Sequence, residues 1–189
     1  MLLYDDTAAA VLDAAADEAR RRGATGYETA HVLLSLVRTA DPVTQTVTAD
    51  HPQLTVDAVR VALGAPSMET PTADGGAAPG RRRSTPEPAL EFRQAAQRFT
   101  AKWRPLVRDR QLHPGLKLGT GELWLTVLEP ATGSARILAA LGVEPDDVRP
   151  LVLAAMVPDG APVPDWPTEV PAGAGRRLLD RVLGRGERP

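Results

Sequence analysis

Apolar residues recur at three- and four-residue spacing along most of the chain, which is the pattern of amphipathic helices. In the first third of the sequence this spacing predicts helices over residues 7–22, 29–37 and 55–64, and a weaker one over 42–48. Thr29 and Thr55 are expected to cap two of them, because a threonine side chain can accept from the free amides of a first turn. The residues before the first proline- and glycine-rich break are therefore predicted to form four helices.

The same spacing returns after that break. It predicts further helices over residues 89–110, 120–128, 133–141 and 144–155, with Thr120 opening the second of these. Pro105 is expected to kink or end the first one, since proline lacks an N–H and clashes with the preceding turn. An Arg/Leu segment over 176–185 reads as a helix that docks on a partner or on the domain itself, with a membrane surface as the weaker alternative.

Composition divides the chain into four parts. Residues 65–88 are rich in Pro, Gly, Ser, Thr and Asp and read as a flexible linker, and residues 157–189 form a proline-rich tail with a short basic helix. The two helical parts, 1–64 and 89–156, lie on either side of the linker.

The two helical parts follow one pattern. Aligning Thr29 with Thr120 also aligns Leu34 with Leu125 and Val37 with Leu128, and a two-residue shift aligns Asp57, Val59 and Arg60 with Asp146, Val148 and Arg149. A whole series of matches at nearly constant offset is the mark of a repeat. We therefore predict an all-α protein made of two four-helix repeats related by a pseudo-twofold axis, with a groove along the seam between them.

Composition and charge exclude several functions. The formal net charge of −2 comes from 22 basic and 24 acidic residues, so no overall field attracts nucleic acid or a membrane. There is no cysteine for a disulfide or a thiolate metal site. The N-terminus has no secretory pattern, and no run approaches the roughly 20 apolar residues that span a bilayer. The cytoplasm is the expected compartment.

The residues also offer no recognisable catalytic or cofactor motif. His31, His51 and His113 share no short spacing, and His31 is expected to be a satisfied core histidine. No serine lies in Gly-x-Ser-x-Gly, and neither Lys102 nor Lys117 follows a phosphate-binding glycine loop. The sequence predicts a protein that is not an enzyme and holds neither metal nor cofactor.

Two stretches resemble a known family. "EARRRGATGYETAHVLLSLV", residues 18–37, and "LGTGELWLTVLEPATGSARILAALGVEPDDVR", residues 118–149, are similar to the two copies of the Clp N-terminal domain, or Clp R domain. The resemblance covers about residues 2–64 and 89–156 and includes no AAA+ module. It implies the mobile front end of a Clp unfoldase, which receives substrates, adaptors and, in some members, cyclic-peptide antibiotics.

The resemblance also bears on phosphoarginine. Some members of the family grip its guanidinium with a glutamate in each repeat, and these positions hold Ala30 and Gly121 here. Neither can make that contact. Glu28 and Glu122 are the candidate polar contacts of the groove. They are poor geometric substitutes, because a shift of one or two residues along a helix turns the side chain in another direction.

The first helices of the two repeats are expected to face each other at the seam. The residues predicted to line the ligand groove there are Leu3, Tyr4, Leu90, Phe92 and Phe99. The resemblance then implies a non-catalytic module that binds proteins or peptides as an adaptor, regulator or decoy. Sequestration of cyclic-peptide antibiotics, and hence antibiotic resistance, is its sharpest form. The alternative is a structural accessory subunit that docks on a Clp protease complex, tunes its assembly and thereby regulates proteolysis.

Overall fold

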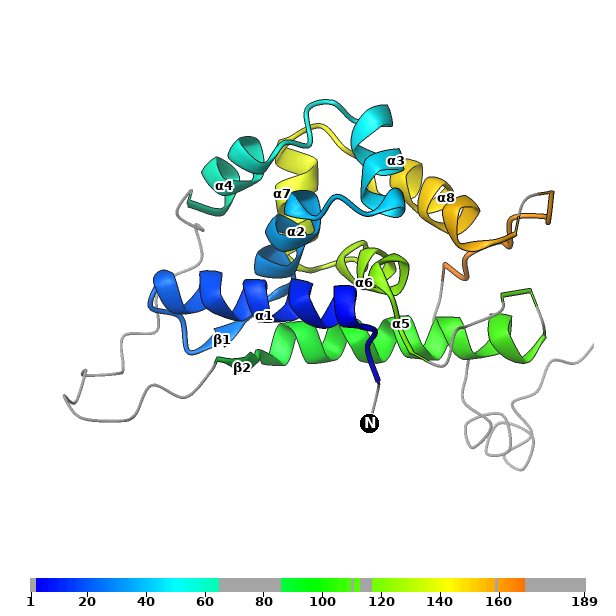
Figure 1. Ribbon diagram of the computed structural model, residues 1–189, viewed down its shortest axis with the longest axis horizontal. Coiled ribbons are helices and arrows are strands. Elements are labelled where there is room, and N and C mark those ends of the chain that lie inside the picture. Colours follow the sequence, from blue (N-terminus) through cyan, green and yellow to red (C-terminus); the bar gives the residue numbers. More distant parts are fainter. Residues whose placement is uncertain (1–2, 65–85, 110, 113–116, 159, 169–189) are drawn as a thin grey trace, which may run out of the picture.

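The computed structural model describes residues 3–64, 86–109, 111–112, 117–158 and 160–168. Within these residues the chain forms eight α-helices and two very short strands (Figure 1). In chain order they are α1 (Asp6–Arg21), β1 (Gly26–Tyr27), α2 (Thr29–Arg38), α3 (Pro42–Asp50), α4 (Val56–Gly64), β2 (Glu87–Pro88), α5 (Leu90–Arg108), α6 (Thr120–Val127), α7 (Gly133–Ala140) and α8 (Pro145–Met156). The predicted helical fold class is confirmed.

Side chains at the helix starts explain most of these boundaries. Asp5 Oδ1 accepts from Ala8 N at 2.7 Å and Asp41 Oδ1 accepts from Val43 N at 3.0 Å, so each satisfies a free amide of a first turn. Thr132 Oγ1 does the same for Ala135 N at 3.1 Å, and the predicted cap Thr55 accepts from Ala58 N at 3.2 Å.

Thr29 was predicted to cap α2 and Thr120 to open α6; the second prediction is confirmed, and the first is corrected by one residue. Thr29 and Thr120 are the first residues of their helices, and the caps are Glu28 and Gly119. The threonine hydroxyls point away from their own helices: Thr29 Oγ1 donates to Glu91 Oε1 at 2.6 Å, and Thr120 Oγ1 donates to Asp41 Oδ1 at 2.8 Å.

The core is built around α2 and α6. Every residue from 29 to 36 and from 120 to 129 is buried, and the two helices contact each other near the middle of the molecule. Helix α2 also packs against α1, α4 and α7, while α6 packs against α5 and α8. In Figure 1, α5 runs along the lower side, and α3, α4, α7 and α8 lie above the central pair.

Two features of the backbone depart from the sequence predictions. Pro105 does not end α5, which continues to Arg108, because the missing N–H falls in the last turns of the helix and affects a single carbonyl. Residues 87–88, assigned to the flexible linker, form β2 and pair in parallel with β1. A two-residue strand carries no hydrophobic periodicity by which a sequence could reveal it. The rest of the linker prediction, residues 65–85, lies outside the described residues.

The strand pairings join segments that are far apart in the sequence. Gly26 is in register with Glu87 and Tyr27 with Pro88, and an isolated parallel bridge joins Tyr4 to Leu118. Gly26 fits this pairing because a Cβ there would lie 2.8 Å from the Glu87 carbonyl oxygen. After α8 the described residues, 157–158 and 160–168, form no helix or strand. The predicted helix over 176–185 lies outside the described residues.

Candidate functional site

An apolar hollow follows one face of α5 beside the N-terminal segment. It has a volume of about 540 Å³, and we call it the α5 groove. Its lining residues are Tyr4, Pro88, Phe92, Arg93, Ala96, Gln97, Thr100, Ala101 and Arg104. Seven of the nine come from α5, so the groove is a helix face with one edge supplied by Tyr4 and Pro88.

Backbone hydrogen bonds fix Tyr4 at this edge. Leu118 N donates to Leu3 O at 2.8 Å, and Asp5 N donates to Leu118 O at 2.9 Å, so both neighbours of Tyr4 are bound to one residue. Asp5 also caps α1, which holds the segment from the other side. Burial raises the pKa of the Tyr4 hydroxyl above its usual value, so this side chain remains a neutral hydrogen-bond donor at physiological pH.

Phe92 lines the α5 groove together with Tyr4. It is 4% exposed, and its ring packs on Tyr27 of β1 with centroids 5.3 Å apart and planes inclined at 57°. A tilted arrangement is favourable for aromatic rings and holds Phe92 in one orientation. Through the contact of Tyr27 with Phe92, the β1–β2 pairing therefore supports this wall of the groove.

Two arginines give the α5 groove a positive rim. Arg93 and Arg104 are exposed, both line the groove, and neither forms an ion pair within the described residues. They are eleven positions apart on one helix, which corresponds to about 16 Å along its axis. Guanidinium groups exposed at the edge of a groove can pair with a carboxylate of a ligand.

The structure brings together two of the five predicted groove residues. Tyr4 and Phe92 line the α5 groove, whereas Leu3 and Leu90 are 60% and 64% exposed and are not among its lining residues. Phe99 is 2% exposed; on another side of α5 it stacks with Trp166 and packs in a tilted arrangement against Trp103. The polar lining residues Arg93, Gln97 and Thr100 could not be predicted, because hydrophobic periodicity identifies the core-facing side of a helix.

Glu28 and Ala30 belong to a separate pocket between α2 and α7. Its volume is about 440 Å³, and it is lined also by Arg22, His31 and Arg136. Burial and the nearby charge of Glu91 together raise the pKa of Glu28. Ala30 presents only a methyl group here, and a Cβ on Gly133 would come within 3.2 Å of it. The α2 and α7 backbones thus approach closely at this point.

Gly121 of α6 aligns with Ala30 in the sequence, and no space is open beside it. Gly121 is buried beneath Met156, whose Sδ would lie 2.6 Å from a Cβ at that residue. Glu122 is 7% exposed and its Oε2 accepts from Gly119 N at 2.8 Å, so it serves as a helix cap. Burial raises its pKa. The structure therefore places Glu28 and Glu122 in different surroundings, neither of them in the α5 groove.

His31 has a structural role. Its Nδ1 accepts from Glu28 N at 3.2 Å, and burial, with a smaller effect of Arg22, lowers its pKa. Among the described residues, no group of three or more His, Asp or Glu side chains is placed to hold a metal ion. No described helix is long and apolar enough to cross a membrane.

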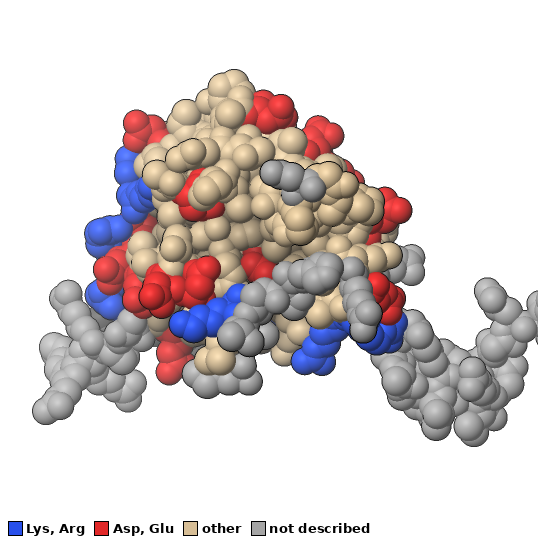
Figure 2. Space-filling view, turned by 45° about the vertical axis from the view of Figure 1, so that its right-hand side comes forward, with Lys and Arg blue, Asp and Glu red and all other residues tan. Residues whose placement is uncertain are grey.

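The surface charge is dispersed. Figure 2 shows a broad uncharged area over the upper part of the molecule, with acidic residues around it and basic residues at the lower and left edges. The described residues on this face form no continuous basic surface of the kind that follows a nucleic-acid backbone.

Comparison with known proteins adds no relative. No protein-family model matches the chain. No curated protein matches it either.

Proposed function

We propose that this chain is a non-catalytic protein- and peptide-binding module related to the substrate-receiving domain of Clp unfoldases. It acts as an adaptor, regulator or decoy, and its ligand site is the α5 groove. The observation that carries the proposal is the apolar groove itself, in which Tyr4 and Phe92, expected from the family resemblance, line one hollow of about 540 Å³.

The proposal includes two four-helix repeats, α1–α4 and α5–α8, and the pattern of contacts supports it. The segment before α2 pairs with the segment before α5, and the segment before α6 pairs with the segment before α1. Exchanging the two halves converts one pairing into the other. The contacts of α3 with α8 and of α4 with α7 are related by the same exchange.

Single residues support the same correspondence. Thr29 Oγ1 accepts from Ser134 N at the start of α7, and Thr120 Oγ1 donates to Asp41 at the start of α3. Val59 and Val148, aligned in the sequence, are each 0% exposed. The Asp-x-Val-Arg motif forms an ion pair within α4 and another within α8, one turn apart in each.

The chemistry of the α5 groove defines the ligand. An apolar floor between Tyr4 and the helix gives affinity through burial of side chains, and the neutral Tyr4 hydroxyl offers a hydrogen bond. Arg93 and Arg104 favour a ligand with a carboxylate near either end. A linear peptide with apolar side chains and a free C-terminal carboxylate has this composition, and so has a cyclic peptide that carries an acidic side chain. A motor-free copy of a receiving domain would then protect a Clp unfoldase from such a ligand by mass action.

The test is calorimetry and thermal unfolding of the full chain with cyclic peptides that bind Clp N-terminal domains. At a hundredfold excess over Kd we expect the unfolding midpoint to rise by roughly 5 °C or more. Ala96→Arg fills the groove with a long side chain and should abolish the shift. Gln94→Arg, exposed on the same helix and outside the groove, is the matched control and should retain it.

Two results would contradict the proposal. No shift for the wild-type chain at saturating cyclic peptide rejects the antibiotic-binding form. An equal shift for wild type and Ala96→Arg rejects the α5 groove as the site.

A further inference from the structure

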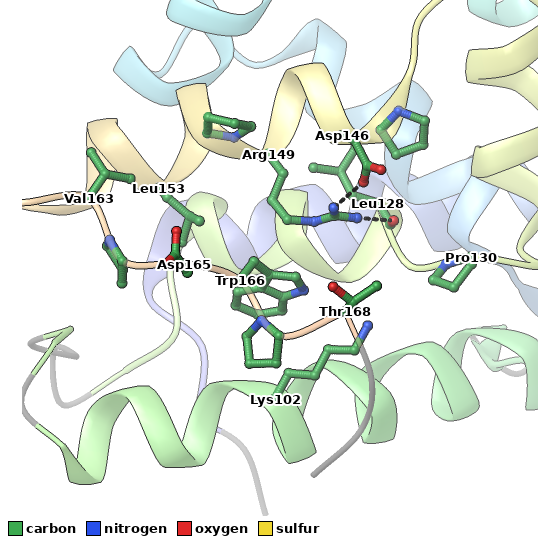
Figure 3. A pocket seen from close by; sticks show the side chains of 14 residues that line it. Lys102, Leu128, Pro130, Asp146, Arg149, Leu153, Val163, Asp165, Trp166 and Thr168 are labelled. Atoms are coloured by element: carbon green, nitrogen blue, oxygen red, sulfur yellow. Dashed lines mark hydrogen bonds and ion pairs between the residues drawn. The ribbon is translucent and has the colours of Figure 1, made fainter.

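A third pocket lies on the side of α5 that faces α8, and the chain's own tail forms one wall of it (Figure 3). We call the cleft between α5 and α8 the tail slot: residues 163–168 lie in it, and a hollow of about 670 Å³ remains open beside them. Helix α8 contributes Arg149 and Leu153, α5 contributes Lys102, and Leu128 directly follows the end of α6. The tail wall consists of residues 163–168.

Trp166 anchors the tail in this slot. Its ring lies 6.1 Å from that of Phe99, centroid to centroid, with the planes only 14° apart, and Phe99 in turn lies 5.5 Å from Trp103. Figure 3 shows the indole between Arg149 of α8 and Lys102 of α5. An aromatic residue of the chain's own tail thus already stacks on a ring of α5 at this slot.

The charges that border the slot neutralise each other. Lys102 Nζ lies 3.0 Å from both carboxylate oxygens of Glu129, whose side chain is fully buried, and Arg149 pairs with Asp146. A lining whose charges are paired offers no net charge to a charged ligand. It suits proline and aromatic side chains, which need no ionic partner.

The tail is held by packing, with little hydrogen bonding. It carries Pro158, Pro162, Pro164 and Pro167, which have no N–H to donate. Among the described residues from 158 to 168, the one recorded hydrogen bond is internal, from Ala161 N to Pro158 O at 3.0 Å. Trp166 Nε1 is buried without an acceptor in the described structure, so the indole loses water and gains no hydrogen bond in return. A segment of the same chemistry can therefore take the place of the tail at this contact.

We propose that the tail slot is a binding site for proline-rich peptide segments that carry an aromatic residue, and that residues 163–168 occupy it in cis. Proline-rich segments are pre-ordered, so they lose little conformational freedom when they dock, and Phe99 offers a ring on which their aromatic residue can stack. A partner with such a segment binds by displacing the tail. The tail slot is separate from the α5 groove, with no lining residue in common, so this inference does not depend on the proposed function.

The test uses the full chain with Trp166→Ala and a fluorescent peptide of residues 157–168. A tethered segment competes at a high effective concentration, so only the fraction of molecules with an open slot can bind the peptide. Fluorescence anisotropy should show at least tenfold tighter binding to the Trp166→Ala chain than to wild type. Trp166→Phe is the matched control: it keeps the stacked ring, and Nε1 has no acceptor to lose, so it should bind as weakly as wild type.

Equal affinity of wild type and Trp166→Ala would overturn the inference, and so would unchanged binding of a peptide whose own tryptophan is replaced by alanine. If Trp166→Ala fails to fold by circular dichroism, the wild-type chain is mixed with excess peptide that carries a photoreactive benzoylphenylalanine in place of tryptophan. Cross-links to α5 and α8 around Lys102 and Leu153 support the site. Cross-links elsewhere, or none, reject it. Ala96→Arg, which fills the α5 groove, should leave this binding unchanged and so separates the two proposals.

Discussion

Thr29 and Glu91, which come before and after residues 65–85 in the sequence, are joined by two hydrogen bonds. Thr29 Oγ1 donates to Glu91 Oε1 at 2.6 Å, and Thr29 N donates to Oε2 at 2.9 Å. Gly133 N, in the first turn of α7, also donates to Oε1 at 2.8 Å. One carboxylate on α5 therefore satisfies free amides at the starts of α2 and α7, where the helix dipoles favour a negative charge.

We expect Glu91→Gln to lower the free energy of unfolding by about 2 kcal/mol, because hydrogen bonds to a charged acceptor are replaced by weaker ones and one buried donor loses its partner. Urea denaturation measures the change. Glu87→Gln is the matched control: this glutamate is exposed, its side chain has no partner among the described residues, and the change should alter stability by less than about 0.5 kcal/mol. Equal effects of the two substitutions would show that Glu91 does not link the helices.

The buried ion pair beneath the tail gives a second prediction. Lys102 is 3% exposed and Glu129 is 0% exposed, so removing one partner leaves a buried charge. Lys102→Met should cost about 3 kcal/mol, moderated by Arg98, whose Nε lies 3.6 Å from Glu129. The double variant Lys102→Met/Glu129→Leu should be more stable than the single one, since no buried charge remains.

The chain's other lysine is the control for that series. Lys117 is exposed and lies 3.7 Å from the exposed Asp6, so Lys117→Met should cost less than about 1 kcal/mol. If the double variant were less stable than Lys102→Met alone, the ion pair would not be the source of the loss.

His31 predicts a pH dependence of stability. Its folded pKa is lowered, so between the ordinary value of about 6.5 and the folded value only the unfolded chain is protonated. The stabilisation is complete above that ordinary value and is lost as the pH falls toward the folded pKa. Glu28 and Glu122, whose pKa values are raised, act with the opposite sign, since their protonation favours the folded chain as the pH falls.

The substitution His31→Asn should flatten that dependence. The asparagine oxygen can take the place of Nδ1 in accepting from Glu28 N, while the titrating ring is removed. Stability measured by urea denaturation at several values between pH 7 and pH 5 should then fall less steeply than in wild type. His51→Asn is the control. If the stability of His31→Asn fell with pH as steeply as that of wild type, the pH dependence would belong to other groups.

The close approach at Gly26 gives a fourth prediction. Gly26→Ala places a Cβ against the Glu87 carbonyl and should destabilise the chain by about 2 kcal/mol through separation of β1 and β2. Gly64→Ala is the control, since a Cβ there meets only Arg22 at 3.9 Å. Thermal unfolding distinguishes them. Similar midpoints for both variants would contradict the tight pairing.

The helices could be predicted from the sequence because each buries one continuous face. The runs around Leu33 in α2 and Leu125 in α6 are apolar on most sides, and both helices are the buried centre of the fold. The strands β1 and β2 could not be predicted, since two residues form no pattern and their pairing depends on contacts more than sixty positions apart.

The groove could be predicted in part. Tyr4 and Phe92 were found because aromatic residues near the first helices are conspicuous, whereas Arg93 and Arg104 look like any solvated arginines until the helix is placed. The position of Phe99 could not be predicted, because it depends on Trp166 returning from an irregular tail to stack on it. Long-range packing by a segment without periodicity leaves no signal in the sequence.

The most direct test of the binding role is the amide spectrum of the ¹⁵N-labelled 20.1 kDa chain, recorded by nuclear magnetic resonance during titration with a cyclic peptide that binds Clp N-terminal domains. We predict that the shifted amides cluster at Tyr4 and along Phe92, Ala96 and Thr100 of α5. Shifts confined to other parts of the chain, or none at saturating peptide, would contradict the account.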